Sequence, residues 1–191
     1  MPIVRRLKFV TAQLGPKPNG SASKALLLDR EDLPGEGWRV LDERTWRAGT
    51  IGPSTPWGDR SRAAKNVVAW RSFEQKTVSR WLWLEVAPFV SHDDALSAVK
   101  GLSSRDFLAN LRAEVVVTRE QTVNDLEIPG IDAVSLIEQE TSGPRGLSTA
   151  QTFLGVVNED VIVIAFSSLD EPWSREQITA VALSQAKCLS N

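Results

Sequence analysis

The sequence predicts an α+β domain with a largely antiparallel sheet of about six or seven strands and helices packed on it. Three observations predict this class. Short apolar or alternating segments recur along the chain between Gly, Pro and Asn turns, a pattern typical of strands. Two longer segments carry helical periodicity and an N-terminal capping signal. The last three predicted strands follow one another through short turns, which indicates an antiparallel meander.

The chain is expected to consist of a basic, flexible segment, residues 1–24, and a single domain, residues 25–191. The first segment carries basic side chains and no acidic one, and its end, GPKPNGSASK, has the composition of a linker. The domain would then begin with ALLLDREDLPGEGW, residues 25–38. There a leucine run ends in an acidic turn and a Pro/Gly stop, which predicts a short strand or helical turn.

A strand and a long loop are expected next. Residues 38–47 alternate and place Trp38, Val40 and Trp46 on one face, so the tryptophans of this strand should serve the core. Residues 48–66 are rich in Gly, Pro and Ser and predict a loop. Loops of more than about 12–15 residues are often functional or mobile in compact domains.

Two neighbouring strands are expected at residues 66–75 and 79–89. In the second, Leu82, Leu84 and Val86 point one way, while Trp81 and Trp83 point the other. Because both faces are apolar, this strand should be central and covered on both sides.

A helix is predicted to start after Ser91, with this serine as its N-cap, Asp94 at N3 and an apolar face that includes Ala95 and Val99. Further strands are predicted at 113–120, 131–140, 147–158 and 160–168. The C-terminal helix should begin at a capping box formed by Ser174 and Gln177 and pack on the sheet. The apolar side chains expected at that interface are Trp173, Ile178, Val181, Ala182 and Leu189.

The side chains that usually carry catalysis are scarce, so the sequence predicts a non-catalytic protein without cofactor or metal. The chain has one histidine, His92, one cysteine, Cys188, and no tyrosine, which excludes the usual zinc ligand sets. No phosphate-binding glycine motif occurs. Glu138 and Glu140 lie two apart on a predicted strand, and we interpret them as a solvated strand face, with a hard-cation site as the alternative.

The candidate binding residues lie in the long loop. Trp57 stands between Pro56 and Gly58, where burial is not implied, and it is followed by Arg60 and Arg62; Arg47 precedes the loop. A tryptophan with nearby arginines is a favourable contact element for a partner. The alternative is that the loop folds back and Trp57 fills the domain. Arg145, in the turn TSGPRG, is a second and weaker candidate that would hold an anion.

Charge and composition also predict partners and location. The formal net charge of −2 argues against nucleic acid, and the basic start of the chain would allow a peripheral lipid contact through Arg5, Arg6 and Lys8. No apolar run is long enough for a signal peptide or a membrane span, and no cysteine stands near the N-terminus for lipid attachment. With one cysteine, a reducing compartment is expected. These observations predict a cytoplasmic protein.

The leucine run with D-L-P and G-W in residues 25–38, together with the order of the predicted strands and helices, resembles a known group of proteins. These are small actinobacterial, especially mycobacterial, cell-envelope-associated proteins of the LpqN lipoprotein or sensor-domain kind. They are similar in turn to PsbP-like α/β/α sandwiches. The resemblance implies a non-catalytic binding or adaptor domain, with a sheet covered by helices.

Three functions are compatible with these features. The first is an adaptor that binds a protein or lipid and is linked to the actinobacterial cell envelope. The second is a single-stranded nucleic-acid-binding module that would use Trp46, Arg47, Trp57, Arg60 and Arg62. The third is a small-molecule-binding protein or enzyme with a cleft between sheet and helix, formed with Glu138, Glu140 or Arg145.

Overall fold

The computed structural model describes residues 26–47, 67–102, 116–124, 126–143, 146–169 and 171–190. These residues form strands, two α-helices and two short 3-10 helices. The strands are β1 (Trp38–Arg47), β2 (Val67–Gln75), β3 (Arg80–Pro88), β4 (Val116–Val123), β5 (Asp132–Gly143), β6 (Gly146–Val157) and β7 (Asp160–Ser168). The helices are η1 (Arg30–Asp32), η3 (Lys76–Val78), α1 (His92–Leu102) and α3 (Arg175–Ser190).

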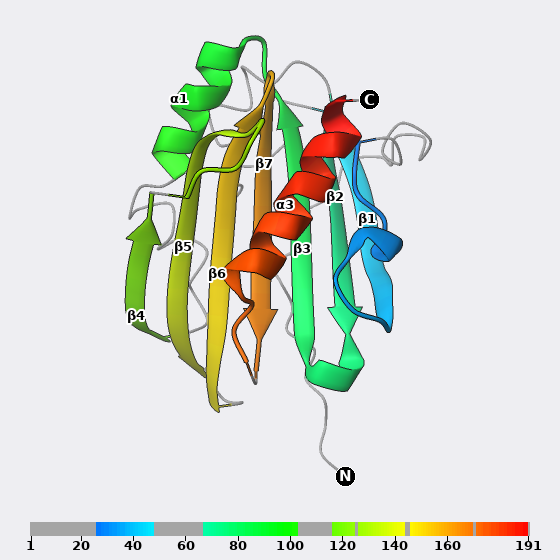
Figure 1. Cartoon of the computed structure of the whole chain (residues 1–191), viewed down its shortest axis with the longest axis vertical. Helices are drawn as coiled ribbons and strands as arrows, with labels where there is room; N and C mark the ends of the chain where they lie inside the picture. Colours follow the sequence, from blue (N-terminus) through cyan, green and yellow to red (C-terminus); the bar gives the residue numbers. More distant parts are fainter. Residues whose placement is uncertain are drawn as a thin grey trace.

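The strands form one seven-stranded sheet in the order β1-β2-β3-β7-β6-β5-β4 (Figure 1). Each neighbouring pair is antiparallel, so the predicted α+β class is confirmed. The sheet consists of two meanders, β1-β2-β3 and β4-β5-β6-β7, which join where β3 pairs with β7. The helix α1 lies on the connection between the two meanders.

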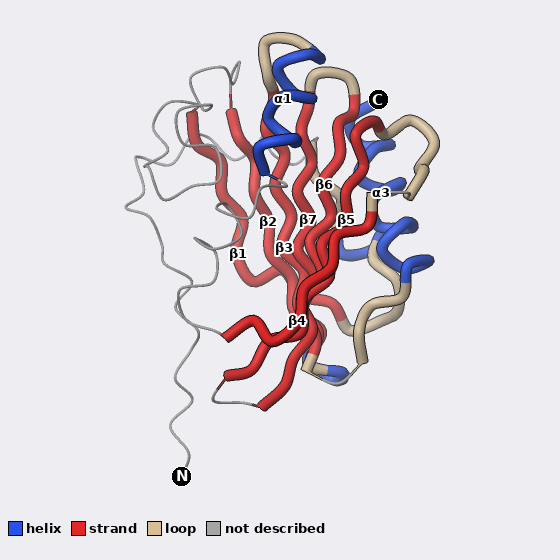
Figure 2. Tube along the Cα trace, turned by 90° about the vertical axis from the view of Figure 1, so that its left-hand side faces the viewer, coloured by secondary structure: helices blue, strands red, loops and turns tan. Residues whose placement is uncertain are grey.

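The two α-helices lie on opposite faces of the sheet, which gives three layers (Figures 1 and 2). On one face, α3 packs through Ile178, Val181 and Ala182 against a core that contains Phe153 and Phe166. On the other face, α1 packs against β5, β6 and β7. The buried residues of this second core are Val68, Ala87, Phe89, Ala95, Ala98, Val99, Ile137, Leu154, Val156, Val161 and Val163.

The central strand β3 has the two covered faces that its pattern predicted. Leu82, Leu84 and Val86 are at most 1% exposed and belong to the core beneath α3. On the face toward α1, Trp83 is half-buried against the second core. That face also holds Glu85, which is 2% exposed and which the apolar pattern of its neighbours did not reveal.

Both predicted N-caps are present. The Ser91 hydroxyl accepts a hydrogen bond from the backbone N–H of Asp94 at 3.2 Å and donates to the Asp94 carboxylate at 2.8 Å. Ser174 and Gln177 form the reciprocal capping box, because each side chain accepts from the backbone N–H of the other at 3.1–3.2 Å. These bonds satisfy backbone donors that a helix start otherwise leaves unpaired.

The two edge strands each contain an irregularity. The register of β1 shifts between Val40 and Asp42, and that of β4 shifts between Val117 and Arg119. Bulges at sheet edges hinder pairing with another chain. Trp38 is buried as predicted, but Val40, on the same face, is 40% exposed because it lies in an edge strand beside this bulge.

The segment that precedes β1 is tied to the sheet and to α3 by buried polar groups. Gln185, which is fully buried, accepts from the N–H of Leu28 at 3.0 Å and donates to the carbonyl of Leu26 at 2.7 Å. Arg71 donates to the Leu28 carbonyl at 2.6 Å and pairs with Glu43 at 2.9 Å. In the described part of the chain, no helix has the length and apolar character needed to cross a membrane.

Candidate functional site

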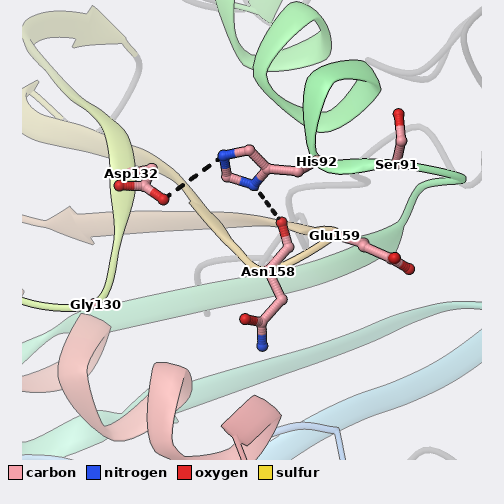
Figure 3. A pocket seen from close by; sticks show the side chains of 6 residues that line it. All are labelled: Ser91, His92, Gly130, Asp132, Asn158 and Glu159. Carbon is pink, nitrogen blue, oxygen red and sulfur yellow. Dashed lines mark hydrogen bonds and ion pairs between the residues drawn. The ribbon is translucent and has the colours of Figure 1, made fainter.

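A pocket of about 540 Å³ lies at the end of the sheet where β3 leads into α1 (Figure 3). Three segments of the chain meet there: the start of α1, the turn before β5 and the turn between β6 and β7. The residues that line the pocket are Ser91, His92, Gly130, Asp132, Asn158 and Glu159.

Local backbone geometry builds the walls of this pocket. Pro129 and Gly130 occupy a turn closed by a 3.1 Å hydrogen bond from the N–H of Ile131 to the carbonyl of Ile128. Gly130 has φ of 79°, as expected for the third residue of a type II turn after proline. Asn158 has φ of 54° in the two-residue β6–β7 turn, a conformation that asparagine tolerates.

Backbone strain also occurs beside the pocket. Ala133 has φ of 51°, within the register shift of β5 that separates Asp132 from Ser135. Alanine rarely adopts this conformation, which costs roughly 1–3 kcal/mol. The fold therefore retains a strained residue directly after Asp132.

His92 connects the three segments. Its Nδ1 lies 2.6 Å from the carbonyl oxygen of Asn158, and its Nε2 lies 3.7 Å from Oδ2 of Asp132. Because a carbonyl oxygen only accepts, Nδ1 must carry a proton and donate it. In the neutral imidazole, Nε2 is then an acceptor that faces the carboxylate. Both side chains are accessible, with exposed fractions of 43% for His92 and 69% for Asp132.

This arrangement differs from a Ser-His-Asp catalytic triad. Such a triad needs a hydroxyl on one imidazole nitrogen and a carboxylate on the other. Here Nδ1 of His92 donates a hydrogen bond to the backbone carbonyl of Asn158. The Ser91 hydroxyl caps α1 and points away from the imidazole (Figure 3). Within the described ranges, no group of three or more His, Cys, Asp or Glu side chains is placed to hold a metal ion.

The binding residues predicted from the sequence remain predictions. Trp57, Arg60, Arg62 and Arg145 lie outside the described residues. The same holds for Arg5, Arg6 and Lys8. Arg47 is the last residue of β1, but the structure describes only its backbone and not its side chain.

The acidic pair on β5 belongs to a polar strand face. The Glu138 carboxylate accepts from the amides of Gln121 at 2.9 Å and Gln151 at 3.3 Å. Glu140 lies 3.7 Å from Arg119. These neighbours on β4 and β6 form a polar strand face around the two carboxylates.

Neither of two pockets that the described residues form includes Glu138 or Glu140 in its lining. A second pocket, of about 290 Å³, lies beside the turn that leads into β1, with Gly35, Gly37 and Trp38 in its lining. Trp38 belongs to the core beneath α3, and its ring lies 5.5 Å from that of Trp173, so this pocket borders that core. The described interfaces between the sheet and the two α-helices are packed with buried apolar side chains.

Sequence reasoning noted His92 only as the single histidine, and it predicted neither His92 nor the residues around it as a site. Asn158 is 66 positions away in the chain, and Asp132 begins a different strand. The available signals were the turn residues Pro129-Gly130 and Asn158, which mark sharp bends without showing that they meet.

Burial shifts the pKa values of Glu85 and Cys188, both of which lie outside the pocket. Burial raises the pKa of Glu85 from its ordinary 4.5 to about 8. Burial, and secondarily the negative charge of Asp32, raises the pKa of the Cys188 thiol. A raised pKa reduces the thiolate fraction, so Cys188 is a poor nucleophile.

Comparison with known proteins gives a likeness of fold. No protein-family model matches the chain, and no curated protein matches it. The extracellular domain of PknH from Mycobacterium tuberculosis superimposes with a TM-score of 0.60 at 13% identity, over 92% of this chain and 99% of that domain. A putative uncharacterized protein from Mycobacterium smegmatis, the Rv0999 ortholog, gives a TM-score of 0.42 at 9% identity, over 80% of this chain and 90% of the other.

The comparison supports the resemblance to mycobacterial proteins at the level of fold. The likeness to PsbP stays a prediction. The expected cytoplasmic location was wrong, because the solved domain that shares this fold is extracellular. The physical basis of that expectation was also weak: a single cysteine cannot form an intramolecular disulfide in any compartment, so its count says nothing about redox environment.

Proposed function

We propose that this chain is a non-catalytic binding domain that acts outside the cytoplasmic membrane, at the cell envelope of a mycobacterium or related actinobacterium. The observation that carries the proposal is the superposition on the PknH extracellular domain, which includes nearly the whole of both chains. Because the superposition covers 92% of this chain and 99% of that domain, the likeness is not limited to a single common hairpin.

The chemistry of the described side chains supports binding over catalysis. The Ser91 hydroxyl is used as a helix cap, the Cys188 thiol has a raised pKa, and His92 is bonded to a backbone carbonyl. An enzyme would need an activated nucleophile or a general base placed beside it. What the pocket offers instead is a set of hydrogen-bond acceptors around a shallow space.

The partner that we propose is a protein or lipid of the envelope, contacted through Trp57, Arg60 and Arg62, with Arg47 at the start of the same segment. Tryptophan and arginine are enriched among the residues that dominate binding energy. The basic residues Arg5, Arg6 and Lys8 would add attraction to anionic headgroups.

Two experiments test the proposal. In intact cells of the source organism, external protease should cleave the tagged full-length protein while a cytoplasmic marker stays whole; equal protection of both would refute the envelope location. In affinity purification, the double variant Trp57→Ala/Arg60→Ala should lose a partner that the wild type recovers. The matched control is Arg30→Ala, since Arg30 is an exposed arginine whose ion pair is local, with Glu31. Equal recovery by all three proteins would refute the loop as the contact element.

A further inference from the structure

We propose that the pocket beside His92 binds the ammonium or guanidinium group of an organic cation, which bridges His92 Nε2 and Asp132 Oδ2. The inference rests on the proposed binding function and specifies a ligand class for this one site. It depends on three features of the pocket: the direction of its hydrogen bonds, the spacing of two acceptors and the sign of the surrounding charge.

Between His92 and Asp132 the pocket presents hydrogen-bond acceptors, while the side-chain amide of Asn158, which could donate, points away from both (Figure 3). Because Nδ1 of His92 donates to Asn158, the neutral ring presents Nε2 as an acceptor. Asp132 adds a carboxylate, and the Ser91 hydroxyl already donates a hydrogen bond to Asp94. An ammonium has three donors and a guanidinium five, and neither has an acceptor, so these cations match the lining.

The distance between the two acceptors fits a shared donor. Nε2 and Oδ2 are 3.7 Å apart, which is too long for a direct hydrogen bond. One nitrogen with hydrogen-bond lengths of about 2.9 Å to each atom fits between two acceptors at this spacing. Both side chains are accessible enough for a ligand to reach this position (Figure 3).

The local charge favours a cation over an anion. Glu159 is a second acidic residue in the lining, and none of the described residues that line the pocket is a lysine or an arginine. The start of a helix often attracts anions, but the first turn of α1 contains Asp93 and Asp94, and its cap Ser91 already accepts from the N–H of Asp94. The positive end of the helix dipole is therefore compensated by the helix itself.

The test is an NMR titration of the full chain, labelled with nitrogen-15, with n-butylammonium and n-butylguanidinium at low salt. We expect saturable shifts of the amides of His92, Gly130 and Ala133, while the isosteric n-butanol leaves them unchanged. Asp132→Asn should weaken binding by about fivefold, the size of an exposed charge pair. The matched control Asp93→Asn makes the same charge change on the adjacent helix turn, outside the lining, and should weaken binding much less.

Several results would overturn the inference: no saturable shift with either cation, equal shifts with n-butanol, or equal weakening by the two aspartate variants. Saturation of the same amides by acetate or by calcium would also overturn it, because the pocket would then be an anion or metal site. None of these outcomes would change the results expected from the protease experiment on location or from the affinity purification of a partner.

The ammonium group that we propose as the ligand could belong to a free amine or to a lysine side chain of another protein. A short peptide with one lysine, compared with its Nε-acetylated form, separates these sources. Binding of the lysine peptide at least tenfold tighter than butylammonium, with loss on acetylation, identifies a protein side chain as the ligand. Equal affinity of peptide and butylammonium identifies a free amine.

Discussion

Replacing Glu85 by Gln is expected to stabilise the domain at neutral and alkaline pH. Glu85 is 2% exposed and lies between Trp83 and Ala87 along β3, opposite Val163 of β7. Burial raises the pKa of its carboxyl to about 8, because the charged form loses its hydration there. Glutamine has nearly the shape of the protonated acid, keeps hydrogen-bonding capacity and does not ionise.

The sign follows from where the proton is held. The folded protein keeps the Glu85 proton up to a pKa of about 8, whereas the ordinary carboxyl loses it near 4.5. The contribution of Glu85 to stability is thus fully present below pH 4.5 and is lost as pH rises to about 8. The slope is roughly 1.4 kcal/mol per pH unit, so the wild type should have lost about 3 kcal/mol by pH 7. The Gln variant should avoid this loss.

The measurement is urea unfolding followed by tryptophan fluorescence at several pH values between 5 and 9, for the wild type, Glu85→Gln and the exposed control Glu171→Gln. The difference in unfolding free energy between wild type and Glu85→Gln should grow with pH up to about 8 and then level off. The control should follow the wild type. A difference that does not change with pH would refute the reasoning, since Glu85 would then be ionised in the folded protein.

Three further predictions concern stability and are measured by the same unfolding assay. Ala133→Gly should stabilise the domain by up to about 1 kcal/mol, because glycine relieves the positive φ, whereas Gly130→Ala should destabilise it by a similar amount; changes of the same sign would contradict this. Gly155→Ala should cost about 1–3 kcal/mol, because the new Cβ would lie 2.5 Å from Cγ2 of Ile131. In the double variant with Ile131→Ala, the loss of unfolding free energy should be smaller than the sum of the two single losses, because the contact with Ile131 is removed. Strictly additive losses would argue against a clash between residue 155 and Ile131. Gln185→Leu should cost at least about 1–3 kcal/mol, since it leaves the buried backbone groups of the first described segment without their partner; an unchanged midpoint would show that water replaces it.

The sequence predicted those strands, turns and helix caps that depend on residues close together in the chain. The β5-β6-β7 meander followed from turns between apolar runs, and the caps at Ser91 and Ser174 followed from side chains three residues from their partners. The central position of β3 followed from its two apolar faces. In each case the interaction that decides the structure connects residues close in sequence or repeats with the period of the element.

The details that needed the tertiary structure connect residues far apart in the chain. Pairing of β3 with β7 decides which strands form the edges, and no local pattern specifies it. The meeting of His92 with Asp132 and Asn158 depends on that strand order, so the pocket could not be read from spacing.

The sequence alone therefore determined the fold class, the helix starts and the face of each apolar residue in the central strand, because hydrophobic periodicity and capping are local. Only the tertiary structure decided that Glu85 is buried and that the single histidine lies beside a carboxylate. Burial and charge proximity are properties of the assembled layers, and they shift a pKa or form a binding site through space and not along the chain.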